Sequence, residues 1–400
     1  MLRRLLSGIG QAWQIAGLSL LLLILVDRGL AVLLPDPGGW APMDPSASAP
    51  HRARAAAVAG ENWIDAYWRE HRASKDTGWR SWVYWRRGPH TGEIINVDAH
   101  GFRVTPATVT PAREEIWIFG GSLVWGTGNR DSGTLPAQLE QILAKRAPER
   151  GLRVSNFGES GYVSRQSLAA FDSALRCAGP RPALAVFVDG ANDVYAALQA
   201  GRAGLPQNEA NRVLEFDGGR DARAALRAMA QRFDGIARLA ATPQPEPDTA
   251  MLAALAKAVA ADYLATVRHA RAIAAAHELP TLHVWQPTVM DRAETRADEG
   301  AIVAASARRH VLLQRMTRAE VFSAAAGDPA LLDAGDVYDD IAEPVFFDFV
   351  HVSERGQRAL AERLAGDILR LLEDRPSDTV AAAADCVERP VPDRHTSPHP

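Results

Sequence analysis

Residues 115–129 (EIWIFGGSLVWGTGN) constrain the fold of this chain more than any other stretch. The unbroken apolar run Ile116–Phe119 is typical of a strand buried on both faces of a parallel sheet. It ends at Gly120-Gly121, which permit backbone angles that a side chain forbids, and Ser122 follows. The spacing of the apolar residues in Leu135–Leu143 then predicts a helix. Ser122 is therefore expected at the carboxyl edge of an open α/β sheet, where such folds keep their sites.

Other motifs fit parts of the same stretch. Gly121 to Thr127 has the glycine spacing of a P-loop but lacks its lysine, so phosphate binding is poorly supported. The glycines fit no G-x-G-x-x-G pattern, and Ser122 fits no G-x-S-x-G elbow because the next glycine is Gly126. A tight turn with an incidental serine is the simplest alternative. The rest of the chain decides between these interpretations.

Strand and helix signals alternate after this stretch, which predicts a doubly wound parallel sheet covered on both faces by helices. The further predicted strands are Leu152–Phe157, Ala183–Val188 and Thr281–Trp285. The further predicted helices are Val163–Leu175, Arg220–Arg232, Ala250–His277, Ala301–Ala326 and Glu354–Glu373.

The amino terminus has the pattern of a membrane anchor. Arg3 and Arg4 precede the apolar segment Ile9–Val26, which Asp27-Arg28 follows. About 20 helical residues span a bilayer, and basic residues on the amino side place that end in the cytoplasm. A cleaved signal peptide is the rival interpretation. The nearest small-residue cleavage pattern lies around Ser46–Ala49, about 20 residues too late, which favours an uncleaved anchor.

We divide the chain into four parts. Residues 1–34 are the cytoplasmic tip and transmembrane anchor, and 35–114 form a linker and an aromatic-rich extension. Residues 115–374 are the main domain, with an insertion at about 200–249, and 375–400 form a loose tail. The extension suits a membrane interface, a glycan-stacking surface or simple packing on the main domain. Its aromatic residues are Trp63, Tyr67, Trp68, Trp79, Trp82, Tyr84 and Trp85.

Composition excludes some function classes. The 400 residues carry 44 Lys and Arg against 48 Asp and Glu, a net charge of −4, so no nucleic-acid partner is expected. The two cysteines, Cys177 and Cys386, have no metal-binding spacing, and neither a metal nor another cofactor is expected. They could form one disulfide in an oxidising compartment or remain two buried thiols.

Polar or glycine signals follow the predicted strands and precede the last helix. They include Ser122, Gly161 in the loop after the second strand, Asn192 after the third, and Asp348 with His351 near the last helix. In a doubly wound sheet these segments converge on one crevice. His351 can serve as the base that a serine nucleophile needs, and Asp348 can fix the imidazole tautomer. The Ser122 and Gly161 N–H groups and the Asn192 amide would form an oxyanion hole.

These segments resemble the four sequence blocks of the SGNH/GDSL hydrolase superfamily, in the family's order. The residues that carry the resemblance are Gly120-Gly121-Ser122 with Gly126, Asn156 to Gly161, Gly190-Ala191-Asn192-Asp193 and Asp348-Phe-Val-His351. Val97–Arg103 (VDAHGFR) is similar to a lead-in of membrane-anchored members. Gly121 stands where the family has aspartate. The resemblance implies a three-layer α/β/α, flavodoxin-like fold, with Ser122, Asp348 and His351 as catalytic residues and Ser122, Gly161 and Asn192 as the oxyanion hole.

The sequence thus predicts a serine ester hydrolase that works through an acyl-enzyme. The expected partners are an ester substrate, such as an acylated glycan or lipid of the cell envelope, and the membrane, through the amino-terminal helix. The expected location is the bacterial inner membrane, single-pass, with the catalytic domain in the periplasm. The alternatives are an O-acyltransferase that modifies an envelope polysaccharide and a non-catalytic glycan-binding protein. The motifs specify no acyl group, alcohol or oligomeric state.

Overall fold

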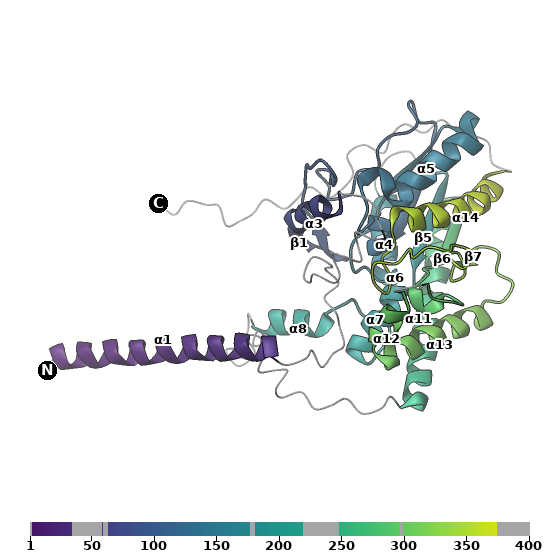
Figure 1. Cartoon of the computed structure of the whole chain (residues 1–400). Helices are drawn as coiled ribbons and strands as arrows, with labels where there is room; N and C mark the ends of the chain where they lie inside the picture. The colour runs from purple at the N-terminus through teal and green to yellow at the C-terminus, as the bar shows by residue number, and fades with distance from the viewer. Residues whose placement is uncertain are drawn as a thin grey trace.

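The computed structural model describes residues 2–33, 58, 63–176, 181–218, 248–296 and 299–373. Its body contains a five-stranded, all-parallel sheet with the spatial order β4-β3-β5-β6-β7. Figure 1 shows helices packed around this sheet. Numbered along the chain, this is the 2-1-3-4-5 order of flavodoxin-like sheets, and the predicted fold class is confirmed. The strands are β3 (Glu114–Gly120), β4 (Leu152–Asn156), β5 (Leu184–Asp189), β6 (Thr281–Trp285) and β7 (Leu331–Asp333).

The point where the strand order reverses locates the crevice of the sheet. After β3 the chain adds β4 on one side and β5 on the other, so the connections leave the carboxyl end of β3 in opposite directions. Open α/β sheets bind ligands at such a switch point. Ser122 directly follows β3, and Asn192 lies two residues beyond the Gly190 that follows β5.

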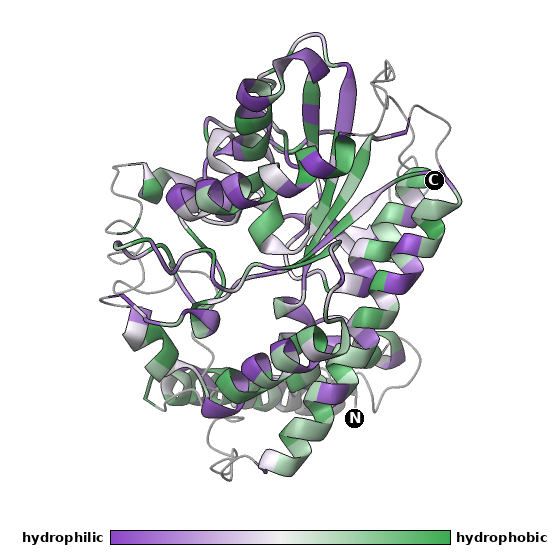
Figure 2. Ribbon diagram, turned by 90° about the vertical axis from the view of Figure 1, so that its right-hand side faces the viewer, coloured by the Kyte–Doolittle hydropathy of each residue, from purple (hydrophilic) through white to green (hydrophobic). Residues whose placement is uncertain are grey.

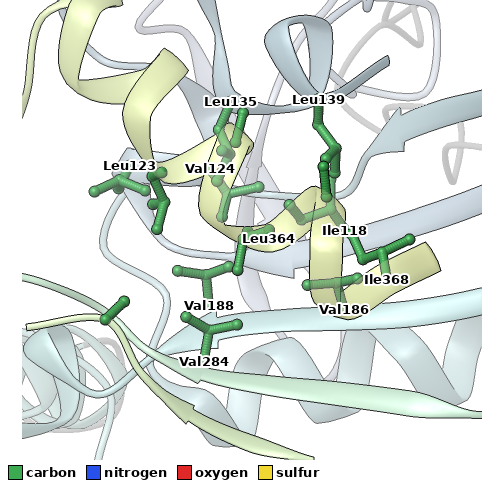
Figure 3. Packing of buried hydrophobic residues seen from close by; sticks show 14 of the residues in the cluster. Ile118, Leu123, Val124, Leu135, Leu139, Val186, Val188, Val284, Leu364 and Ile368 are labelled. Atoms are coloured by element: carbon green, nitrogen blue, oxygen red, sulfur yellow. The ribbon is translucent and has the colours of Figure 1, made fainter. Parts of the chain in front are cut away.

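One face of the sheet packs against α5 (Leu135–Arg146) and α14 (Glu354–Leu372). Ile118 of β3 and Val186 of β5 project into this core, in which Leu364 of α14 is also fully buried. Figure 3 shows these side chains interleaved between the strands and the helix. Because alternate strand residues point to this face, the apolar run of β3 contributes only every second side chain to it.

The opposite face packs against α6 (Ser164–Leu175) and α11 (Thr249–Ala275). The alternate residues Trp117 and Phe119 of β3 and Phe187 of β5 form this second core. Burial on both faces explains the apolar runs Ile116–Phe119 of β3 and Leu184–Val188 of β5, as the green central strands in Figure 2 show. The other α-helices among the described residues of the body are α4 (Ser122–Trp125), α7 (Ala191–Ala200), α8 (Glu209–Gly218), α12 (Glu299–Ala305) and α13 (Arg308–Ala324).

The prediction of one helix over Ala301–Ala326 is wrong. The segment forms α12 and α13, which are separated at Ala307, where φ is −57° and ψ is 129°. Ser306 Oγ donates to the carbonyl of Ile302, a local bond that competes with helix continuation. No glycine or proline marks this break in the sequence, so the periodic pattern could not reveal it. β7 was not predicted, because its three residues are too short for a periodic signal.

The amino-terminal helix α1 (Leu2–Leu33) extends away from the body in Figure 1. Its window Trp13–Leu33 has a mean hydropathy of 2.1 and is long and apolar enough to cross a membrane, as a signal sequence also can be. The apolar window therefore ends later than the predicted Ile9–Val26. Helix α11 passes the same test with a mean hydropathy of 1.5, but it packs inside the body against α13 and α6.

The aromatic-rich extension packs on the body in large part. It contains α3 (Ile64–Ala73) and an antiparallel hairpin of β1 (Thr77–Arg80) and β2 (Tyr84–Arg87). Tyr67 and Trp68 are buried, whereas Trp79 of β1 and Trp82 of the turn between the two strands are 69% and 78% exposed. The predicted helix Arg220–Arg232, both cysteines and the predicted tail 375–400 lie outside the described residues.

Candidate active site

A sharp turn presents Ser122 at the end of β3. Gly121 has an extended backbone, and α4 begins at Ser122, whose relative exposure is 3%. Asn156 at the end of β4 supports the turn, because its amide donates to the carbonyl of Val124 over 3.0 Å. Strand, turn and neighbouring strand thus hold the hydroxyl at the switch point of the sheet.

Three of the predicted residues form a hydrogen-bonded chain. His351 Nε2 lies 2.7 Å from Ser122 Oγ, and His351 Nδ1 lies 2.7 Å from Asp348 Oδ2. Residues separated by 229 positions in the sequence are therefore in direct contact. With a proton on Nδ1 facing the carboxylate, Nε2 has a free lone pair for the serine proton. The arrangement can activate a hydroxyl as a nucleophile.

Asp348 is held as a carboxylate. Burial raises its pKa, but the adjacent His351 and the hydrogen bonds to this carboxylate outweigh burial and hold the pKa below its usual value. The backbone N–H groups of Val350 and His351 donate to Oδ1 over 2.9 and 2.8 Å. One oxygen is thus occupied by the loop itself, and the other faces the imidazole. This loop geometry explains the D-x-x-H spacing of the motif.

The predicted oxyanion groups lie beside the nucleophile turn. Asn192 Nδ2 donates to the carbonyl of Tyr162 over 2.8 Å, which places the amide next to Gly161. Gly161 has a φ of +80°, a conformation that favours glycine. Among the described residues, the backbone N–H groups of Ser122 and Gly161 donate to no acceptor. They are therefore available to a ligand, and their role in an oxyanion hole stays a prediction.

The glycine at position 121, where the family motif has aspartate, leaves space that the Asn192 amide occupies. A Cβ atom at Gly121 would lie 2.3 Å from Asn192 Nδ2 and 3.3 Å from the carbonyl oxygen of Tyr162. Real Cβ atoms essentially never approach another heavy atom so closely. The absent side chain thus allows the Asn192 amide to lie against the nucleophile turn.

Arg103, the last residue of the VDAHGFR segment, is a supporting residue whose role does not follow from the sequence. Its side chain is fully buried, and its guanidinium pairs with Asp131 over 2.9 Å. It also donates to the carbonyls of Gly126 over 2.7 Å and Asn129 over 2.6 Å. Its guanidinium carbon lies 4.5 Å from the ring centroid of Trp125. Arg103 therefore fastens the loop that follows Ser122.

Arg87 performs a similar task for the loop that carries Gly161. Its backbone N–H donates to Glu159 over 3.0 Å, and its side chain donates to Ser160 Oγ over 3.0 Å. Its guanidinium carbon lies 3.8 Å from the centroid of Trp125, whose ring therefore has close contacts with two arginines. Trp85 Nε1 donates to the Ser160 carbonyl over 2.9 Å. The aromatic extension is thus part of the site's support.

Polar contacts also join the nucleophile loop to the histidine loop. Asn129 Nδ2 donates to the carbonyl of Val352 over 2.9 Å, and Gln357 Nε2 donates to that of Leu123 over 3.0 Å. Arg130 and Glu354 form a bidentate ion pair, with distances of 2.8 Å for both bonds. These contacts explain how two distant segments keep the short distance between Ser122 and His351.

Two buried carboxyl groups lie under the site. Burial, followed by the neighbouring Asp193, raises the pKa of Asp189 well above its usual value. Burial also raises the pKa of Asp193 to about 6, opposed mainly by hydrogen bonds from Ser164. Ser167 Oγ donates to Asp189 over 2.9 Å. Asp193 belongs to the predicted G-x-N-D block, and here it accepts from the N–H and hydroxyl of Ser164.

A cavity of about 470 Å³ lies elsewhere, at the carboxyl ends of β6 and β7. Its polar lining comes from Asp291, Arg292, Arg315, Arg318 and Asp333. None of the predicted site residues lines it, so it gives no support to the site described above.

A family model described as GDSL-like lipase/acylhydrolase matches residues 116–364. A comparison with curated proteins found no match. Among solved structures, a G-D-S-L lipolytic protein from Veillonella parvula is 16% identical, with a TM-score of 0.35, over 65% of this chain and 99% of that one. The acetylxylan esterase Axe2 from Geobacillus stearothermophilus is 14% identical, with a TM-score of 0.35, over 64% and 94%.

Proposed function

Because the chain belongs to the GDSL-like lipase/acylhydrolase family and is an ester-hydrolysing enzyme, we propose that Ser122, His351 and Asp348 carry out its chemistry. The supporting observation is the hydrogen-bonded chain from Ser122 Oγ through His351 to Asp348, with 2.7 Å at each step. A base beside a serine is what nucleophilic catalysis requires, and a glycan-binding module has no need of it.

The proposed reaction has two steps. Ser122 Oγ attacks the ester carbonyl while His351 Nε2 takes its proton, and the alcohol leaves with the proton that His351 returns. Water activated by the same imidazole then attacks the acyl-enzyme and releases the acid. In both steps the negative oxygen would lie among the N–H groups of Ser122 and Gly161 and the amide of Asn192.

We further propose that the substrate is an envelope ester, such as an acylated glycan or lipid, and that α1 anchors the enzyme with its body outside the cytoplasm. The support is the apolar window Trp13–Leu33 and the basic pair Arg3-Arg4 on its amino side. Under this proposal, residues 115–374 are the catalytic unit. Residues 63–114 support the catalytic unit through the contacts of Arg87 and Arg103 described above.

Labelling with a fluorophosphonate probe tests the nucleophile. The parent should be labelled on Ser122 and should hydrolyse p-nitrophenyl acetate. Ser122→Ala should show neither labelling nor hydrolysis, and its thermal unfolding midpoint should equal that of the parent. Ser132→Ala is a matched control, because Ser132 is exposed. A label on another residue, or parent-like turnover by Ser122→Ala, would sink the assignment. Release of the acyl group to a sugar hydroxyl in preference to water would identify an acyltransferase.

Fractionation tests the anchor. The full chain should remain in the membrane fraction after carbonate washing, with its carboxyl-terminal body open to protease added from the periplasmic side. A soluble mature form that begins near Ala49 would show that the segment is a cleaved signal, and protection of the body would contradict the orientation.

A further inference from the structure

Gln207 lies outside all four family blocks, in the segment predicted to be an insertion, yet it contacts the proposed oxyanion hole. It precedes α8, and its relative exposure is 8%. Its Nε2 donates to Asn192 Oδ1 over 3.0 Å. Its Oε1 lies 3.4 Å from the position that a Cβ atom would occupy at Gly161. One side chain from the insertion thus reaches both Asn192 and Gly161.

The hydrogen bonds of Asn192 determine which way its amide faces. Nδ2 lies 2.8 Å from the carbonyl oxygen of Tyr162, which can only accept, so the NH₂ group must face it. Oδ1 accepts from Gln207 on the other side. An amide nitrogen carries two hydrogens, and among the described residues the second hydrogen of Nδ2 has no acceptor. Tyr162 and Gln207 together therefore leave one N–H available for a ligand.

We infer that Gln207 is a positioning residue, which holds the Asn192 amide with its free N–H directed into the oxyanion hole. If the Asn192 amide turned over, its Oδ1 would face both the Tyr162 carbonyl oxygen and the developing oxyanion, and oxygen atoms that only accept would repel one another. With Gln207 in its present orientation, Nδ2 would also face the Gln207 donor, so two like donors would meet. The inference rests on the proposed function, because an oxyanion forms only if Ser122 attacks an ester.

Two substitutions of Gln207 distinguish the effect of its hydrogen bond to Asn192 from the effect of its side-chain volume. Gln207→Met keeps a side chain of similar length and removes the donor, so kcat for p-nitrophenyl acetate should fall about tenfold, the effect of one lost neutral hydrogen bond. Gln207→Glu places a carboxylate against Asn192 Oδ1. Because a carboxylate only accepts hydrogen bonds, it favours the orientation of the Asn192 amide in which Nδ2 faces residue 207. Its kcat should fall about 10²- to 10³-fold, as after loss of an oxyanion donor. In both variants KM should change much less than kcat.

The pH profile gives a readout that a purely structural role would not move. Below its pKa the introduced carboxyl carries a proton and can donate to Asn192 Oδ1 again. The ratio of kcat for Gln207→Glu to kcat for the parent should therefore rise as pH falls. Gln141→Glu is the matched control, because Gln141 lies on helix α5 and, among the described residues, its side chain donates only to the Ser132 carbonyl. The ratio of kcat for Gln141→Glu to kcat for the parent should stay constant with pH.

A double-mutant cycle tests whether Gln207 acts through Asn192. In an Asn192→Ala background, Gln207→Met should change kcat by no more than about twofold, the scatter of independent effects. An equal tenfold loss in both backgrounds, or parent-like kcat in both Gln207 variants, would overturn the inference. Absence of fluorophosphonate labelling in the parent would instead overturn the proposed function together with this inference.

Discussion

At the scale of single residues, the candidate site depends on where hydrogen-bond donors point. The hydroxyl, imidazole and carboxylate of the proposed triad are joined at 2.7 Å, and loop N–H groups occupy the second oxygen of Asp348. Asn192 lies against Gly121 because no side chain separates them. Small changes in atom type at these positions should therefore have large effects on rate.

Asp348→Asn should lower kcat by about 10⁴-fold with little change in the fold. The amide oxygen can still accept the N–H groups of Val350 and His351, so the NH₂ group faces His351 Nδ1. The imidazole then carries its proton on Nε2 and cannot take the proton of Ser122. Hydrolysis of p-nitrophenyl acetate measures the loss, and Asp340→Asn, at an exposed position, is the control. Parent-like turnover would exclude Asp348 as the orienting group.

Gly121→Asp restores the family motif and should nevertheless damage this enzyme. The new Cβ would lie 2.3 Å from Asn192 Nδ2, so the amide or the turn must shift. We expect at least a tenfold lower kcat, up to the 10²- to 10³-fold loss typical of a missing oxyanion donor. Gly366→Asp is a control, because a Cβ there meets nothing within 4 Å. Unchanged or higher activity in Gly121→Asp would show that Asn192 adapts freely.

At the scale of elements, loops outside the family blocks hold the site together. The β1–β2 hairpin and the segment that ends in Arg103 pack on the loops that carry Gly161 and Ser122. Arg130–Glu354 and Gln357 connect the nucleophile loop to α14. The sheet brings the strand ends to one edge. The contacts between the loops that follow these strands determine the distances between the site residues.

Arg103→Lys should destabilise the fold and slow labelling of Ser122. A lysine keeps the charge but cannot donate to Asp131, Gly126 and Asn129 at once, because it lacks the planar guanidinium. We expect the free energy of unfolding to fall by about 2–4 kcal/mol, as when a buried charged network loses members. Urea denaturation measures it, with the exposed Arg146→Lys as control. Equal free energies of unfolding for Arg103→Lys and Arg146→Lys would contradict the role of Arg103 in holding the loop that follows Ser122.

At the scale of the whole molecule, two buried carboxyl groups lie under the edge of the sheet that carries the candidate site. Asp189 ends β5, and Asp193 lies in the first turn of α7. Their raised pKa values mean that the folded state holds protons that the unfolded chain releases. The pH dependence of stability should report this difference.

Asp189→Asn should become more stable relative to the parent as pH rises from about 4. The unfolded parent loses its Asp189 proton near the usual pKa, whereas the folded parent keeps it until the raised pKa is passed. Over that range the contribution of Asp189 to the free energy of unfolding of the parent falls by up to about 1.4 kcal/mol per pH unit. The variant has no proton to lose at position 189, so it lacks this fall. Urea denaturation at several pH values measures the difference, with Asp340→Asn as control. A constant difference between Asp189→Asn and the parent would contradict the raised pKa.

The sequence by itself determined the order of β3, β4, β5 and β6 along the chain and the polar segments that follow them. The buried strand β3, its glycines and Ser122 could be recognised because local periodicity and backbone freedom are properties of neighbouring residues. The family blocks added Gly161, Asn192, Asp348 and His351 as candidates, and a parallel sheet brings its strand ends to one edge.

Only the tertiary structure decided which distant groups touch. The break between α12 and α13 has no glycine or proline signal, and β7 is too short for a periodic one. Arg103 and Gln207 resemble ordinary polar residues in the sequence, because their roles depend on carbonyl and amide groups that folding brings to them. Local sequence determines which segments can form strands and turns, whereas hydrogen bonds between segments more than ten residues apart exist only after the chain has packed.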